Sequence, residues 1–234
     1  MTILDATDPQ GWGPALDEAV NAVQRGALVV LPTDTVYGVG ADAFDPEAVA
    51  ALLAAKGRGR HQPPPVLVGG LRTLDGLARD VSAEARALAA RFWPGGLTII
   101  LDAQPSLAWD LGDTHGTVAL RQPDHPAALA LLQRTGPLAV SSANLSGRPP
   151  ATTAAEAHEQ LGTAVAVYLD GGTAPGGVAS TIVDATSGRL RLVRSGAIPI
   201  EALREVAEVA DLPGPELEEP ADDAPEGPDE GRDA

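Results

Sequence analysis

The stretch Asp45-Pro46-Glu47-Ala48-Val49-Ala50-Ala51-Leu52-Leu53-Ala54-Ala55-Lys56-Gly57 has the features of a complete helix. Aspartate at its first position suits the N-cap, the proline suits the first helical turn, and Gly57 is typical of a helix end. Apolar side chains recur at helical spacing up to Leu53, and Lys56 comes three residues later. The pattern therefore predicts a helix whose buried face ends in an ammonium group.

Three cations, Lys56, Arg58 and Arg60, gather at the end of this predicted helix. Lys56 is the only lysine of a chain that has 16 basic and 32 acidic residues and a formal net charge of −16. A cationic cluster against this background favours a pocket for an anionic ligand. The alternative is that the cations complement the negative end of the helix dipole, which contributes about 0.3 to 1 kcal/mol. This stretch alone leaves both interpretations open.

On either side of this helix, the hydrophobic pattern predicts strands that alternate with helices. Further helices are predicted at 14–25, 82–92, 126–133 and 153–162. Strands are predicted at 27–31, 66–68, 97–101, 117–121, 138–140, 165–169, 180–184 and 190–194. The last two strands form a predicted hairpin. Alternation of this kind predicts an α/β fold, and the hairpin makes its sheet mixed.

The composition predicts one domain followed by an acidic tail. A chain of 234 residues with 44% hydrophobic residues can bury a full core, and we expect one domain over 1–210. Residues 211–234 are rich in acids and prolines, which predicts a disordered tail. There is no cysteine, signal peptide or run of membrane-spanning length, so we expect a soluble cytoplasmic protein with no membrane contact.

Charge also argues against nonspecific nucleic-acid binding. Leu212 to Ala234 holds nine acids and one arginine, so the remainder has 23 acids, 15 bases and a net charge of −8. Proteins that bind nucleic acids tightly do so by neutralising phosphates with Lys and Arg. Aromatic residues, at 3% of the chain, are too few for a base-stacking platform. A local basic groove remains open.

Three polar clusters are expected to gather where predicted strands end, as ligand sites of α/β sheets usually do. They comprise Thr33 and Thr35 beside the three cations; Ser141, Ser142 and Asn144; and Ser180 and Thr181 with Arg194. Hydroxyl, amide and guanidinium groups suit a phosphate and a carboxylate, with about 1.5 to 3 kcal/mol for each charged hydrogen bond. Taken singly, each cluster could equally be a capped turn, an ordinary loop or a flexible connection.

Common nucleotide and metal motifs are missing. No glycine run is followed by Gly-Lys-Ser/Thr, and Gly38-Val39-Gly40 lacks the third glycine of a dinucleotide fingerprint. The histidines have no metal-site spacing and are expected to be surface or structural residues, with His61 the one to watch. These four histidines are His61, His115, His125 and His158.

At the level of whole motifs, the chain resembles the YrdC/Sua5 family of threonylcarbamoyl-AMP synthases, in its short form. The resemblance covers about Leu16 to Ile198. It rests on Pro32-Thr33-Asp34-Thr35-Val36-Tyr37-Gly38, Lys56-Gly57-Arg58, Trp93-Pro94-Gly95, Val118-Ala119-Leu120-Arg121, Ser142-Ala143-Asn144-Leu145-Ser146-Gly147 and Ala179-Ser180-Thr181. The family fold implied by it is a single twisted, open mixed sheet with flanking helices and a concave cleft.

The resemblance also implies the reaction. L-threonine, bicarbonate and ATP would give threonylcarbamoyl-AMP and pyrophosphate, with Mg²⁺ held mainly by the ATP phosphates and no metal site on the protein. The product would pass to a separate transferase that modifies adenosine 37 of tRNAs reading ANN codons, and a weak tRNA contact is possible within this scheme. A relative with another activity, such as a YciO-like one, and an RNA-binding module are the alternatives.

Motif matching assigns the site residues. The resemblance implies ATP binding by Lys56, Arg58, Thr117, Ser142, Asn144, Pro150 and Arg194, with Lys56 and Arg58 as the catalytic cations. It implies threonine binding by Thr35, Arg121, Val140 through its main chain, and Ser180. Gln62 and Leu67 depart from the family, which often has asparagine and a threonine-binding histidine there, so the resemblance assigns no threonine contact to either residue.

Overall fold

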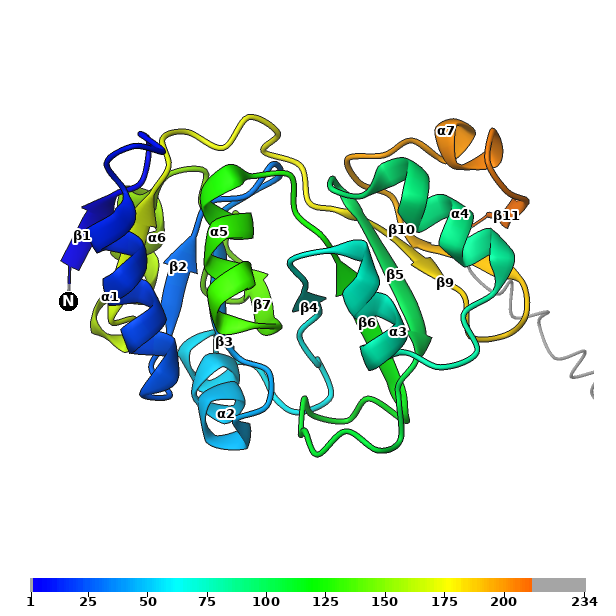
Figure 1. Cartoon of the computed structure of the whole chain (residues 1–234), viewed down its shortest axis with the longest axis horizontal. Coiled ribbons are helices and arrows are strands. Elements are labelled where there is room, and N and C mark those ends of the chain that lie inside the picture. Colours follow the sequence, from blue (N-terminus) through cyan, green and yellow to red (C-terminus); the bar gives the residue numbers. More distant parts are fainter. Residues whose placement is uncertain (1, 212–234) are drawn as a thin grey trace, which may run out of the picture.

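One sheet of eleven strands runs through the part of the chain that the structure describes, residues 2–211 of this computed structural model (Figure 1). The strands are β1 (Thr2–Asp5), β2 (Val29–Leu31), β3 (Gly38–Asp42), β4 (Val66–Leu67), β5 (Leu97–Asp102), β6 (Thr117–Arg121), β7 (Leu138–Ser142), β8 (Val167–Asp170), β9 (Thr181–Asp184), β10 (Leu190–Arg194) and β11 (Val209–Ala210). Their order is β1-β8-β2-β3-β7-β4-β6-β5-β9-β10-β11, with parallel and antiparallel neighbours. The predicted mixed α/β sheet is confirmed.

The helices cover the sheet. They are α1 (Gly13–Gln24), α2 (Pro46–Ala55), α3 (Leu74–Leu77), α4 (Ala83–Phe92), α5 (Pro126–Thr135), α6 (Ala154–Leu161) and α7 (Ile200–Arg204), with short 3₁₀ turns at Leu71–Thr73 and Gly162–Ala164. Figure 1 shows α1 and α5 side by side at one end of the sheet and α4 at the other. Within residues 2–211 no helix is both long and apolar enough to cross a membrane.

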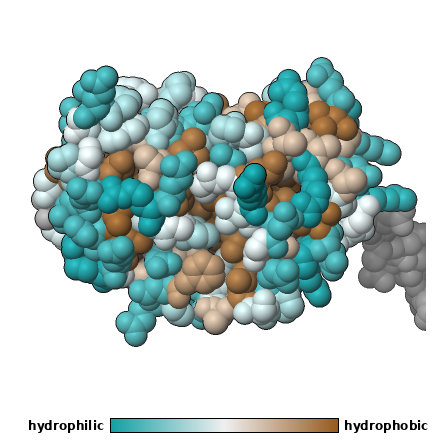
Figure 2. All heavy atoms as spheres, in the orientation of Figure 1, coloured by the Kyte–Doolittle hydropathy of each residue, from teal (hydrophilic) through white to brown (hydrophobic). Residues whose placement is uncertain are grey.

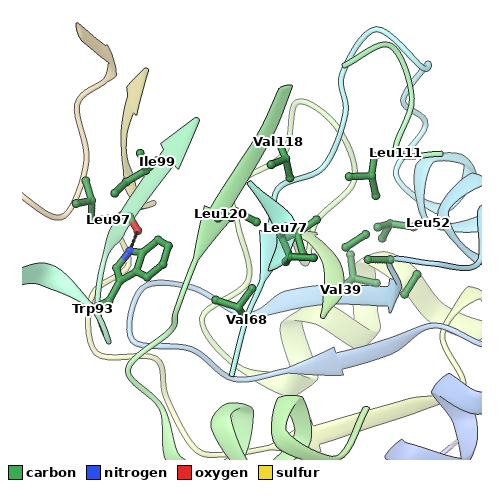
Figure 3. Close-up of a cluster of buried hydrophobic side chains, with 14 of the residues drawn as sticks. Val39, Leu52, Val68, Leu77, Trp93, Leu97, Ile99, Leu111, Val118 and Leu120 are labelled. Carbon is green, nitrogen blue, oxygen red and sulfur yellow. Dashed lines mark hydrogen bonds between the residues drawn. The ribbon is translucent and has the colours of Figure 1, made fainter. Parts of the chain in front are cut away.

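Two buried clusters of apolar side chains hold the helices to the sheet. Neighbouring residues of one strand belong to different clusters, as Val29 and Val30 do, because successive strand side chains point to opposite faces. The cluster that contains Val29 includes apolar residues of α1 and α5. The cluster that contains Val30 reaches α2, α4 and α6, and in Figure 3 the indole of Trp93 donates to the Leu97 carbonyl oxygen within it, at 2.7 Å.

Helix α2 forms as its sequence predicts. The Asp45 carboxylate accepts hydrogen bonds from two backbone N–H groups of the first turn, at 3.0 and 3.1 Å. At the other end Gly57 has a φ of +64°, and the N–H groups of Gly57 and Arg58 donate to Ala54 and Leu53 carbonyl oxygens. This is the paired-bond C-cap that glycine favours. It turns the chain just after Lys56.

Strand β3 is missing from the predictions. Its sequence, Gly38-Val39-Gly40-Ala41-Asp42, has low strand propensity, but it pairs with both β2 and β7. A Cβ atom at Gly38 would lie 2.6 Å from the Val140 Cγ1 atom, so the glycine allows the two strands to pack. Strands β1 and β11 and helix α7 were also not predicted, because they are short and lack strong periodicity.

Two local features depart from the simplest sequence pattern. Thr153 and Glu156 have capping-box spacing, but only half of the box forms: Thr153 accepts from the Glu156 N–H, whereas the Glu156 carboxylate accepts from Thr152. In β10, strict alternation would place Arg194 on the same face as Leu190 and Leu192, but a register shift between Leu192 and Arg194 leaves Arg194 exposed. The prediction of a disordered tail over 211–234 falls on residues outside the described range, apart from Asp211, and the domain boundary stays a prediction.

Candidate functional site

Lys56 is buried, with 1% of its surface exposed, at the end of α2. Its ammonium group donates to three oxygens across the site: the Ser142 carbonyl, the Asn144 carbonyl at 2.7 Å and the Asn144 side-chain Oδ1 at 3.1 Å. An ammonium group has three N–H donors, so all of them are used. Lys56 therefore ties α2 to the end of β7, and it acts on its surroundings through its charge.

The environment of Lys56 opposes that charge. Burial, followed by the nearby positive charge of Arg58, lowers the pKa of Lys56 from 10.5 to about 7. The three oxygen acceptors favour the charged form, because a neutral amine could serve only two of them. Lys56 is therefore a buried group that gains or loses its proton near neutral pH.

Arg58 continues the positive charge beyond the turn at Gly57. Its Nη1 donates to the Ser141 hydroxyl at 3.0 Å, and burial lowers the pKa of Arg58. The Nε of Arg58 is buried and has no hydrogen-bond partner. A buried N–H without a partner is costly, so Arg58 has unused capacity for an anionic acceptor.

Arg121 ends β6 and is buried, with 7% of its surface exposed. Its Nε donates to the Gly95 carbonyl at 2.9 Å, Nη1 to the Thr35 hydroxyl at 2.9 Å, and Nη2 to the Asp34 carboxylate at 2.6 Å. A guanidinium group has five N–H donors, so one remains on each Nη nitrogen. Two N–H groups on a fixed guanidinium suit a carboxylate.

Arg194 is the last residue of β10 and contributes the fourth cation of the site. Its Nε and Nη2 donate to the Ser180 carbonyl at 3.1 and 2.6 Å, and Nη2 also contacts the Ser180 hydroxyl at 3.1 Å. That hydroxyl is 2.8 Å from the hydroxyl of the buried Thr98. Burial lowers the pKa of Arg194, and the charges of Arg121 and Arg58 lower it further. The charge of Arg194 is thus coupled to those of both arginines.

We call Lys56, Arg58, Arg121 and Arg194 the cationic cluster. They come from three separate parts of the chain, yet their charges act on one another. Like charges held close together repel unless an anion lies between them. The arrangement therefore suits a polyanionic ligand, and the predicted grouping of these cations with Thr35, Ser142, Asn144 and Ser180 is what the structure forms.

Arg60 does not join the cluster, contrary to the expectation from its sequence position. Its guanidinium pairs with the carboxylates of Asp110, at 2.8 Å, and Asp113, at 3.5 Å, on the exposed surface. Two acids from the segment after β5 thus neutralise it, a contact that no local pattern near Arg60 reveals.

Several other predicted site residues already have partners. The Thr117 hydroxyl donates to the Thr114 carbonyl at 2.8 Å, at the opposite end of β6 from Arg121. The Val140 N–H donates to the Pro65 carbonyl at 2.8 Å. Their assigned roles stay predictions.

The loop after β7 is organised by Asn144. Its Nδ2 donates to the Leu145 and Arg148 carbonyls at 3.0 and 2.6 Å, and its Oδ1 accepts from the Ser142 hydroxyl at 2.5 Å. Asn144 thus shapes the loop that leads to the half-buried Pro150. Contacts of Ser142 and Pro150 with ATP stay predictions.

Gln62 and Leu67, which depart from the family motifs, lie in different environments. Gln62 is exposed, and Leu67 is buried in the core cluster that contains residues of α1 and α5. His61 is exposed, whereas His125 is half buried, burial lowers its pKa, and its Nδ1 has no hydrogen-bond partner. Leu67 therefore supplies no polar group.

The donor set gives no sign of a resident metal ion. Among residues 2–211, no three His, Asp or Glu side chains are grouped in a way that could hold one. Asp34, the acid that contacts the cationic cluster, is paired with Arg121. Phosphate groups supply the oxygen ligands that Mg²⁺ prefers, and the expectation of Mg²⁺ held mainly by ATP stays a prediction.

Two surface pockets lie mostly outside the cationic cluster. One of about 320 Å³ is lined by Ser82, Glu84, Arg189 and Glu208 at the β10–β11 end of the sheet. Another, of about 250 Å³, lies along α2 and includes Arg58. Neither is lined by Lys56, Arg121 or Arg194, so burial and charge, not pocket size, identify the site. Figure 2 shows hydrophilic side chains spread across one face of the molecule, with apolar patches between them.

Comparison with known proteins identifies a family whose model matches most of this chain. The family model for Sua5/YciO/YrdC proteins, described as "Telomere recombination", matches residues 21–196. The chain belongs to the Sua5/YciO/YrdC family. This confirms the resemblance that the motifs predicted.

Individual Sua5/YciO/YrdC proteins match over most of the chain. A Mycobacterium tuberculosis protein, provisionally named as a threonylcarbamoyl-AMP synthase, is 53% identical over 203 residues, which is 87% of this chain and 94% of that protein. The Bacillus subtilis threonylcarbamoyl-AMP synthase is 38% identical over 207 residues, 87% of this chain and 60% of its own length.

A solved structure shares the fold. The Pyrococcus abyssi Sua5 structure in complex with L-threonine is 34% identical, with a TM-score of 0.82 over 89% of this chain. This chain spans 62% of that Sua5 chain. The fold predicted for the family is therefore confirmed.

Proposed function

We propose that this protein is an L-threonylcarbamoyl-AMP synthase, an enzyme that joins a carboxylated threonine to the AMP part of ATP. Its 53%-identical and 38%-identical relatives carry that activity in their names, and a structural neighbour has L-threonine bound. One observation of this chain carries the proposal: the buried or half-buried cations Lys56, Arg58 and Arg121 gather with the more exposed Arg194. Unused N–H donors remain on Arg58 and on Arg121.

The nucleotide half consists of Lys56, Arg58 and Arg194. Within residues 2–211 none of these three cations forms an ion pair with an acid, and the oxygens that they contact are uncharged. Positive charge that no carboxylate neutralises suits phosphate groups. Mg²⁺ is proposed to arrive with ATP as part of the substrate, and it would supply further positive charge on the phosphates.

The amino-acid half consists of Arg121 with Thr35. The two N–H groups left on Arg121 would hold the α-carboxylate of threonine, beside the Thr35 hydroxyl that Arg121 contacts. Ser180, which Arg194 contacts, is proposed to complete this half. The threonine amine reacts with bicarbonate to give a carbamate and water. A carbamate oxygen then bonds to the α-phosphorus, and the bond from that phosphorus to the pyrophosphate breaks, which makes the enzyme a nucleotidyltransferase.

Repulsion between anions is the main obstacle to this reaction, because a second carboxylate must approach a polyphosphate. The cationic cluster lowers that repulsion and holds both anions in one place, so catalysis rests on positioning and electrostatics. Lys56 has no N–H to spare, so it would act by charge and by positioning Ser142 and Asn144. Arg58, which has donors to spare, would touch the phosphates.

The wider setting is proposed from the same activity. The enzyme would work in the cytoplasm and pass its product to a separate transferase that modifies adenosine 37 of tRNAs reading ANN codons. A direct tRNA contact would be weak, since the chain without its last 23 residues has a net charge of −8.

The test is pyrophosphate release from ATP in the presence of bicarbonate and Mg²⁺, with each amino acid supplied in turn. We expect release with L-threonine, and none when either threonine or bicarbonate is left out. Equal release with many amino acids, or release without bicarbonate, would show another activity.

A further inference from the structure

The Asp34 carboxylate separates the cationic cluster into two unlike halves. It accepts from Nη2 of Arg121 at 2.6 Å, and the side chains of the two residues are 18% and 8% exposed. Among the described residues this is the one ion pair that any member of the cluster forms with an acid. Within residues 2–211 no acid pairs with Lys56, Arg58 or Arg194, whereas Asp34 largely cancels the charge of Arg121.

Asp34 is itself held in place. The oxygen that contacts Arg121 also accepts from the Asp124 N–H at 2.9 Å, just before α5. Gly176 packs against the Asp34–Thr35 backbone so closely that an added Cβ atom would lie 3.0 Å from the Asp34 carbonyl oxygen. The carboxylate therefore cannot easily swing away from the guanidinium.

We propose that Asp34 determines which anion the Arg121 side of the site accepts. An arginine without a paired acid attracts phosphate at least as well as a carboxylate, because both match its planar donors. Pairing with Asp34 leaves Arg121 two directed N–H donors but little net charge. A monoanionic carboxylate still gains both hydrogen bonds, whereas a phosphate meets the Asp34 charge and is repelled.

Asp34 thus keeps phosphate and pyrophosphate out of the amino-acid half, so that the nucleotide binds only beside Lys56, Arg58 and Arg194. This inference rests on the proposed function for the identity of the amino acid, but not for the effect on anion binding. The neighbouring His125 feels the charges of Asp34 and Asp124, yet burial lowers its pKa, so it adds little positive charge at neutral pH.

Asp34→Asn tests the proposal, because it removes the charge and keeps the shape. We expect inorganic phosphate to bind this variant at least tenfold more tightly than wild type by calorimetry. In the pyrophosphate-release assay, phosphate should become a competitive inhibitor against threonine, with at least a tenfold rise in KM for threonine and a smaller change in KM for ATP. A role in folding alone would not produce competition of this kind.

The matched control is Asp110→Asn, which makes the same change of charge in the exposed pair of Asp110 with Arg60. It should leave both phosphate binding and KM for threonine unchanged. Asp34→Glu, which restores the charge, should bind phosphate no more tightly than wild type.

Three outcomes would overturn the proposal. One is phosphate binding by Asp34→Asn no tighter than by wild type, and another is an equal gain in Asp110→Asn. If Asp34→Asn does not fold, as judged by thermal melting, Asp34→Ser replaces it, and failure of both to fold would assign Asp34 to stability alone. Wild type that shows no threonine-dependent activity would refute the proposed function, while the calorimetric comparison would still decide the role of Asp34.

Discussion

The pKa of Lys56 provides the most specific test of the structure. Burial and the charge of Arg58 bring its pKa down from 10.5 to about 7. ATP phosphates near the cluster would restore the charged form and raise the pKa of Lys56 again. Binding of ATP above pH 7 should therefore take up a proton, and the affinity should fall by up to about tenfold for each pH unit until the pKa of the bound form is reached.

The same pKa difference links pH to folding. The unfolded chain keeps the proton of Lys56 up to about pH 10.5, whereas the folded chain releases it near 7. Between these values unfolding takes up a proton, so the contribution of Lys56 to stability rises with pH. At about 1.4 kcal/mol for each pH unit, the whole window amounts to at most about 5 kcal/mol. Below pH 7 the buried charge lowers stability by that amount.

The assay is unusually clean because the chain has a single lysine. Protein grown with ¹³C-labelled lysine gives one side-chain Cε signal, whose shift can be followed from pH 6 to 11. We expect a midpoint near 7 in the free protein, one near 10.5 in urea, and a higher value with saturating ATP than without it. Arg58→Gln should raise the midpoint of the free protein.

A midpoint of 10 or above in the free, folded protein would refute this account. It would mean that the three oxygen acceptors outweigh burial and the repulsion from Arg58. Unchanged ATP affinity between pH 7 and 9 would separately refute the coupling to the nucleotide.

Three further substitutions test other parts of the structure. Arg121→Lys should raise KM for threonine at least tenfold with a smaller effect on KM for ATP, since one ammonium cannot replace the planar donors; equal effects on both would contradict the division of the site. Thr98→Val should lower the unfolding free energy by about 1 kcal/mol, measured by urea denaturation, because the Ser180 hydroxyl loses a buried partner. Gly38→Ala should cost about 1 to 3 kcal/mol in the same assay, because its Cβ would lie 2.6 Å from the Val140 side chain, and a neutral result would show that β3 and β7 can move apart.

Local sequence patterns predicted what neighbours along the chain decide. The cap at Asp45, the turn at Gly57 and the inward position of Lys56 all depend on residues within a few positions of one another. Each of these features is present in the structure. The helix end was therefore readable from sequence alone.

Patterns could not reveal contacts between distant segments. The acceptors of Lys56 lie 86 and 88 residues further along the chain, and Arg60 is neutralised by Asp110, 50 residues away. Asp34 stood inside a recognised motif, but only its contact with Arg121, 87 residues away, gives it a role. Strand β3 was missed because glycine lowers strand propensity, and the packing that favours glycine there involves β7.

The chain has a single lysine, and that lysine is buried. A lysine-specific endoprotease therefore has one cleavage site, which the folded protein protects. Cutting after residue 56 requires α2 to detach from the β7 loop, so the rate of cleavage measures how often that region opens. A nucleotide that closes the region should slow the cut, which provides a readout of occupancy that needs neither turnover nor a label.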